Sequence, residues 1–313
     1  MIPIEALRAV RRIITHANCA DGRASAVILH AALPDAEVVE VAHDTPEHLM
    51  MPAEPGLLFC DFTPPLARVP EFVAAGAIVL DHHKGAEAVV RAFGQRGVFA
   101  DEKAEPGVSG AVLAYLHVYL RVLGAPSIAD GLACDAAEAC CRLAYLVGIR
   151  DTWQRSSPDW DRACAVSAAV RFLPLDEALK RGPVGVMAFA SEAGALLVRK
   201  QMEAAREAAR HAVRVEIGGR RVALISSVSL TSDVADLLRE HCEIVAGFDY
   251  VHDELGARLQ WSLRSRGDVD VSAIARRHGG NGHTAAAGFS VQLDPEDPGT
   301  QLNPYRMAER LLD

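Results

Sequence analysis

An apolar run that stops at three metal-binding side chains constrains this chain most. Residues 76–80 read Gly-Ala-Ile-Val-Leu and lead directly into Asp81, His82 and His83. A short run of this kind predicts a strand of a parallel sheet that is buried on both faces. Ligands bind at the carboxyl edge of open α/β sheets, and imidazole beside carboxylate suits Mn, Fe or Zn. We therefore expect a metal site at this strand end, with solvated imidazoles as the alternative.

Two more predicted strands end in the same chemistry. Residues 11–15 lead to His16 and then to Asp21, and residues 56–60 lead to Asp61. A glycine or a proline pair follows each carboxylate, as expected for turns. A single Asp after a strand is commonly a helix cap or a turn residue, but three such strand ends favour a shared site.

Asp151 is a fourth candidate. It follows the apolar, helix-like stretch 140–149, and its alternative role is to cap the next helix. The other three positions make a place in the same site the better interpretation.

The order of these motifs resembles the DHH phosphoesterase superfamily, which includes RecJ-type exonucleases, nano-RNases, family II pyrophosphatases and some exopolyphosphatases. The residues that carry the resemblance are His16, Asp21-Gly22, Asp61, Asp81-His82-His83 and Asp151. A second resemblance, to the domain associated with DHH proteins, lies in residues 261–265, 271–275 and 279–289. Its mark is the loop Gly279, Gly280, Asn281, Gly282, His283, followed by Ala-Ala-Gly-Phe.

The first motif departs from the usual pattern at Cys19, where many members carry an aspartate. A thiolate ligand would favour Zn or Fe, and a thiol that keeps its proton would remove one ligand. A small residue in a tight turn is an equal alternative. The motif also resembles a subgroup of the superfamily, so we interpret Cys19 as a variant of the site.

The resemblance implies a metal-dependent hydrolase that uses metal-activated water. It implies two divalent cations, most simply Mn, with Mg, Fe or Zn as alternatives. The expected metal ligands are His16, Cys19, Asp21, Asp61, His82 and Asp151, and the expected catalytic residues are Asp61, Asp81, His82 and His83. Asp81 is expected to orient His82, and His83 to face the substrate phosphate. Arg264 and the loop Gly279, Gly280, Asn281, Gly282 and His283 are expected to bind substrate, because backbone N–H groups of glycines form anion nests.

The expected fold is α/β, in two parts. Short apolar strands alternate with Ala-rich helical patterns, such as 24–32 and 108–123, which predicts a parallel sheet. We predict a DHH domain over 1–185, a linker helix over 186–212 and a smaller α/β substrate-binding domain over 213–313. In the last part, residues 214–217 and 222–225 predict a hairpin, residues 245–249 and 258–263 predict further strands, and Leu237 and Leu238 lie on a predicted helix.

Composition limits the partners and the location. The net charge of −9 argues against coating long duplex nucleic acid but not against a short phosphodiester or polyphosphate in a cleft. Seven cysteines without a Cys-x-x-Cys pair, and no visible signal peptide or membrane span, make a cytoplasmic protein the simplest expectation. A homodimer is included among the expected states.

Three functions compete at this point. The first is hydrolysis of short oligonucleotides or of linear and cyclic dinucleotides, and the second is hydrolysis of inorganic polyphosphate or pyrophosphate. The third is a non-catalytic nucleotide-binding regulator in which Cys19 has disabled the metal site. The Gly-Gly-x-Gly-His loop favours a nucleotide substrate, although aromatic residues for base stacking are only 5% of the chain.

Overall fold

The computed structural model of the chain describes residues 1–43, 45–100, 107–124, 131–254, 256–266, 268–293 and 303–312, without the side chains of 131–134, 253 and 281. The chain divides into two compact units, Met1–Val198 and Arg199–Asp313. Among the helices of the described ranges, none has both the length and the apolar character that crossing a bilayer requires.

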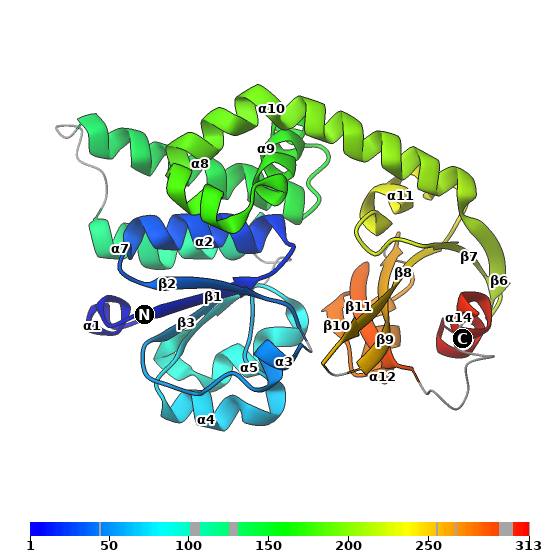
Figure 1. The fold of residues 1–313 in the computed structure, drawn as a ribbon, viewed down its shortest axis with the longest axis horizontal. Helices are drawn as coiled ribbons and strands as arrows, with labels where there is room; N and C mark the ends of the chain where they lie inside the picture. The colour runs from blue at the N-terminus through cyan, green and yellow to red at the C-terminus, as the bar shows by residue number, and fades with distance from the viewer. Residues whose placement is uncertain are drawn as a thin grey trace. The chain divides into compact units, whose positions relative to one another are not determined.

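The first unit contains a five-stranded parallel sheet in the order β2-β1-β3-β4-β5 (Figure 1). Its strands are β1 (Arg12–His16), β2 (Glu37–Val41), β3 (Leu57–Cys60), β4 (Ile78–Asp81) and β5 (Gly97–Phe99). Its α-helices are α1 (Ile4–Arg8), α2 (Ala20–Ala32), α3 (Pro46–Leu49), α4 (Val69–Ala74), α5 (Glu87–Ala92), α6 (Gly110–Ala114), α7 (Leu120–Leu123), α8 (Gly131–Asp151) and α9 (Trp160–Phe172). Three 3-10 turns, Leu66–Arg68, Lys84–Ala86 and Gly94–Arg96, and a π-helix, Tyr115–Tyr119, complete it.

Helices cover both faces of this sheet, with α2, α8 and α9 on one side and α4 and α5 on the other (Figure 1). Successive strand residues face opposite sides. Ile13, Leu58 and Leu80 therefore join the core beneath α2, while Ile14, Phe59 and Val79 join the core beneath α4 and α5. Burial on both faces explains why β3 and β4 are uninterrupted apolar runs.

The long helix α10 (Leu175–His211) runs from the first unit into the second. Its helical geometry breaks at Gly182, whose φ is 61°, immediately before Pro183. Proline favours the first turn of a helix, so the uninterrupted part begins close to residue 183.

The second unit contains a six-stranded sheet in the order β10-β11-β9-β8-β7-β6. Its strands are β6 (Val213–Ile217), β7 (Arg220–Ile225), β8 (Ile244–Asp253), β9 (Gly256–Ser265), β10 (Asn281–His283) and β11 (Ala286–Gln292), and its helices are α11 (Thr231–Leu238), α12 (Val271–Arg277) and α14 (Pro304–Leu312). β7 and β8 are parallel and the other neighbours are antiparallel. One core lies on the α12 and α14 face around Trp261, and a smaller one lies around Val234 of α11.

The predicted α/β fold class is confirmed, including the parallel sheet of the first unit and the β6–β7 hairpin. Four strands, β2, β5, β10 and β11, were not predicted. The stretch 108–123, predicted as one helix, is α6, the π-helix and α7 in succession. The predicted linker helix over 186–212 lies within α10, which ends at His211 because Val213 pairs with Leu224 of β7.

Candidate metal centre

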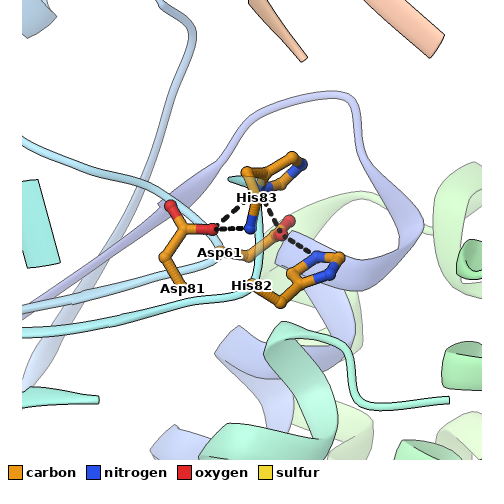
Figure 2. A group of neighbouring side chains, drawn as sticks. All are labelled: Asp61, Asp81, His82 and His83. Carbon is orange, nitrogen blue, oxygen red and sulfur yellow. Dashed lines mark hydrogen bonds and ion pairs between the residues drawn. The ribbon is translucent and has the colours of Figure 1, made fainter. Parts of the chain in front are cut away.

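Three neighbouring strands of the parallel sheet bring acidic and imidazole side chains to its carboxyl edge. His16 is the last residue of β1, Asp61 follows β3 directly, and Asp81 is the last residue of β4, with His82 and His83 after it. Because β1, β3 and β4 are adjacent and parallel, their ends meet at one edge. Figure 2 shows the resulting group of Asp61, Asp81, His82 and His83.

His82 lies among three carboxylates. Its Nε2 is 3.3 Å from Oδ1 of Asp61, 3.5 Å from Oδ2 of Asp151 and 3.7 Å from Oδ2 of Asp21. The His82 side chain is 2% exposed, so these charges act with little screening by solvent. Burial opposes protonation of His82, but the Asp61 hydrogen bond and the carboxylate charges outweigh it and raise its pKa well above the usual value.

The carboxylate of Asp21 accepts hydrogen bonds from the N-terminal end of α6, which is distant in sequence. Ser109 donates to Oδ1 from its hydroxyl at 2.6 Å and Ala111 donates to the same oxygen from its backbone N–H at 3.0 Å. The Gly110 N–H donates to Oδ2 at 2.6 Å. A Cβ at Gly110 would lie 2.5 Å from the Asp61 Cβ and 2.8 Å from Asp21 Oδ2. Only glycine therefore lets α6 approach both carboxylates.

Asp61 occupies the most constrained position of the group. Its backbone φ is 57°, a left-handed conformation that Asp and Asn tolerate better than most residues. The residue is 1% exposed, and its Oδ2 is buried with no hydrogen-bond partner among the described residues. Burial and the charge of Asp21 raise the pKa of Asp61 to about 7.

These features fit a cation. A buried carboxylate oxygen without a donor is costly, whereas a metal ion would use that oxygen as a ligand. Three overlapping groups have one ligand atom per residue within 4.8 Å of one another: Asp61, Asp81, His82 and His83; His16, Cys19 and Asp61; and Asp21, His82 and Asp151. All six residues predicted as metal ligands therefore occur in these groups, and Cys19 lies close to two of them.

His16 and Cys19, which precede α2, differ from His82 in their protonation. Desolvation and the charge of His83 lower the pKa of His16 to about 4, so its ring is neutral near pH 7, as a metal ligand must be. Desolvation and the charge of Asp61 raise the pKa of the Cys19 thiol well above its usual value. A cation at Cys19 must therefore displace a proton.

Asp81 and His83 form a tight pair. Oδ1 of Asp81 accepts from the backbone N–H of His83 at 2.8 Å and lies 2.7 Å from Nδ1 of the same residue. Burial alone would raise the pKa of Asp81, but the charges of His83 and His82 lower it to about 2. Desolvation opposes protonation of His83, but Asp81 outweighs it and raises the His83 pKa to about 9. His83 is therefore cationic near pH 7.

The glycine loop of the second unit has structural requirements of its own. Gly279, with φ 77°, follows α12, and a Cβ at Gly280 would lie 2.1 Å from the Gly288 carbonyl oxygen of β11. Gly282 has φ 144° and also packs against β11. Gly280 and Gly282 are thus needed for β10 to pair closely with β11. For Asn281, only the backbone, which belongs to β10, is described.

Arg264 and His283 lie at the same level of the second sheet. His283 of β10 pairs with Ala286 of β11, and Ala286 pairs with Arg264 of β9. The Arg264 guanidinium donates to Ser232 Oγ at 2.9 Å, to Ser262 Oγ at 3.1 Å and to the Leu263 carbonyl oxygen at 2.9 Å.

Sequence reasoning missed several residues near the centre. Ser109 and Gly110 anchor Asp21 from 88 and 89 residues away, and no local pattern indicates such a contact. His43 follows β2, and its ring centroid is 5.2 Å from that of His16. The signal for His43 was available, because it follows a fourth strand end, but β2 has two acidic residues among three valines without strict alternation and was not recognised as a strand.

The sequence matches no protein-family model and no curated protein. Solved structures do match. A DHH domain described as a member of a family of ribosomal proteins aligns at a TM-score of 0.58 with 14% identity, over 98% of this chain and 88% of that one. RecJ from Thermus thermophilus, in complex with Mn²⁺, aligns at a TM-score of 0.51 with 19% identity, over 97% of this chain and 52% of that one. This chain thus spans about half of RecJ. The chain therefore shares the fold of these two structures, the first of which is a DHH domain, and its sequence motifs resemble the DHH phosphoesterase superfamily.

Proposed function

We propose that the protein is a metal-dependent phosphoesterase that hydrolyses phosphodiester bonds in short oligonucleotides or in linear or cyclic dinucleotides. The observation that carries the proposal is the buried Oδ2 of Asp61, which has no hydrogen-bond partner among the described residues and lies among five other predicted ligand side chains at the carboxyl edge of the sheet. The Mn²⁺ complex of RecJ, which shares the fold, supports a divalent cation as the cofactor.

Two ligand sets divide the proposed site. His16, Cys19 and Asp61 would hold one cation, and Asp21, His82 and Asp151 would hold the other. Asp61 Oδ1 lies 3.3 Å from His82, so Asp61 links the two sets. When bound, a pair of divalent cations lowers the pKa of water and neutralises charge on a phosphate.

The residues around these sets have separate roles. The hydrogen bonds from Ser109, Gly110 and Ala111 fix both oxygens of Asp21 before any cation arrives. Asp81 keeps His83 cationic and oriented, so His83 can attract a substrate phosphate. The role of Asp81 in orienting His82 stays a prediction.

The second unit is proposed to bind the remainder of the substrate. Arg264 and His283 lie level with each other across β10, β11 and β9, where an Arg and an imidazole can contact phosphate oxygens. The glycines of the loop also serve the packing of β10 against β11, so their contribution to substrate binding is a separate question from their contribution to the fold.

A panel assay tests the proposed function. The purified protein is loaded with Mn²⁺ and offered short RNA, short DNA, a cyclic dinucleotide, and polyphosphate, with Asp61→Ala as the inactive control. We expect hydrolysis of at least one nucleotide substrate and none by Asp61→Ala. Hydrolysis of polyphosphate alone would favour an inorganic polyphosphate or pyrophosphate hydrolase. Binding of a nucleotide without its hydrolysis, whichever metal is added, would favour a non-catalytic nucleotide-binding regulator.

A further inference from the structure

Four rings gather beside the proposed metal ligands, at the ends of β1, β2 and β3. They belong to His16, His43, His48 and Phe62. The ring centroid of His43 is 4.3 Å from Phe62, 5.2 Å from His16 and 5.3 Å from His48. His43 therefore lies near all three other rings of this ring cluster, as Phe62 also does with centroids 5.9 Å from His16 and 4.9 Å from His48. Neither the sequence motifs nor the ligand sets include His43.

His43 is also the member of the ring cluster that solvent reaches most. It is exposed, whereas Phe62 is 0% and His48 4% exposed. His48 is fixed by its Nε2, 3.0 Å from the Thr63 carbonyl oxygen. The His43 ring makes no hydrogen bond to any residue that the structure describes, and it packs on Phe62 with an interplanar angle of 35°. His43 is thus an exposed residue whose ring packs against the apolar ring of Phe62.

The pairing of β1 with β2 places His43 beside a residue of the proposed metal centre. Ala17 donates its N–H to the Val41 carbonyl oxygen at 2.9 Å, so the end of β2 stays beside the end of β1. His43 comes two residues after Val41 and reaches His16, a member of the first ligand set. In a nucleotide the base lies one sugar away from the phosphate, so a ring beside the metal ligand His16 is in a position to meet the base of a substrate whose phosphate lies at the metals.

We propose that His43 is a base-stacking residue: its exposed face receives a nucleobase of the substrate, and Phe62 supports the ring from behind. The inference rests on the proposed function and specifies its substrate class as base-bearing. Stacking on an aromatic face accepts any base, so the ring would select nucleotides over polyphosphate without reading sequence. A low aromatic content is no obstacle, because a platform of this kind needs one exposed ring.

Two dinucleotide substrates separate stacking from other roles. One carries both bases and the other has the same sugar-phosphate backbone without bases. We expect His43→Ala to raise KM for the base-bearing substrate by about 5- to 140-fold, the range that loss of one stacked base corresponds to. KM for the abasic substrate should not change. His43→Phe should restore the wild-type KM, because a phenyl ring stacks but cannot donate a hydrogen bond.

The controls make each outcome decisive. Glu47→Ala, an exposed change in the same segment, should leave both KM values unaltered. Quenching of a 2-aminopurine dinucleotide on binding reports stacking without turnover, and His43→Ala should abolish it. If His43→Ala raises both KM values equally, or if His43→Phe does not restore binding, stacking is refuted. If the wild type quenches the probe but hydrolyses nothing, the proposed function fails while the stacking site stands.

Discussion

Replacing Asp61 by Asn should stabilise the metal-free protein while it abolishes activity. The pKa of Asp61 is raised from 3.8 to about 7 in the folded protein, chiefly by burial and then by the charge of Asp21. The folded state therefore binds the Asp61 proton more tightly than the unfolded state does. Above pH 7 that proton is lost, and the folded state bears the full cost of an ionised carboxylate. Three pKa units correspond to about 4 kcal/mol.

Asparagine has nearly the shape of protonated Asp and carries no charge, so Asp61→Asn should remove this cost. Its left-handed backbone also suits Asn. At pH 8 we expect the metal-free variant to melt roughly 8–16 °C above the metal-free wild type, using about 2–4 °C per kcal/mol for a domain of this size. The difference in unfolding free energy should shrink to about 2 kcal/mol at pH 5 and vanish below about pH 3, where the wild-type carboxyl is protonated in both states.

Thermal unfolding followed by circular dichroism, after treatment with EDTA and again with Mn²⁺, provides the measurement. Mn²⁺ should raise Tm of the wild type more than that of the variant, because a ligand stabilises only the state that binds it. Asp35→Asn, which removes an exposed carboxylate, is the matched control and should change Tm little at either pH. A metal-free Asp61→Asn protein that melts below the wild type at pH 8 would refute the reasoning.

Three further predictions concern other parts of the proposed site. Gly110→Ala should weaken Mn²⁺ binding at least tenfold, measured by calorimetry, because the added methyl group would lie 2.5 Å from the Asp61 Cβ and 2.8 Å from Asp21 Oδ2; unaltered affinity would contradict this packing. With Co²⁺, the wild type should show a sulfur-to-metal charge-transfer band in the near ultraviolet that Cys19→Ser lacks, and a wild type without the band would exclude Cys19 as a ligand. His283→Ala should raise KM for an oligonucleotide by the factor that corresponds to a loss of about 1.5 to 3 kcal/mol of binding free energy. The bound metal and the hydrolysis of a nitrophenyl ester should be retained. Equal losses on both substrates would count against a role in substrate binding.

The strand-end residues of the proposed site were accessible from the sequence because their information is local. An apolar run buried on both faces stands out in any window, and the residue after it lies at the carboxyl edge wherever the strand sits in the sheet. His16, Asp61 and His82 were found in this way, and the structure brings them together.

The hydrogen bonds that position the site residues could not be predicted from the sequence, because they join residues that are distant in sequence. Nothing near Asp21 indicates that Ser109, Gly110 and Ala111 bind its carboxylate. β2 was missed for a different reason. Its burial is partial and its sequence, Glu-Val-Val-Glu-Val, neither alternates strictly nor forms an unbroken apolar run, so it lacks both patterns that predict a strand. Missing β2 also concealed His43 and the ring cluster.

The left-handed residues of the first unit limit which mutations the site can accept. Asn18, Asp61 and Trp153 are the non-glycine residues with positive φ in the described ranges, and each lies within three residues of a proposed metal ligand or is one. A mutational scan should therefore show selection at Asn18, although it carries no proposed chemistry. Asp and Gly should be accepted there and Val, Ile and Thr rejected, since β-branched side chains fit this backbone poorly. Sequence drift around the site would then be governed by backbone shape as much as by ligand chemistry.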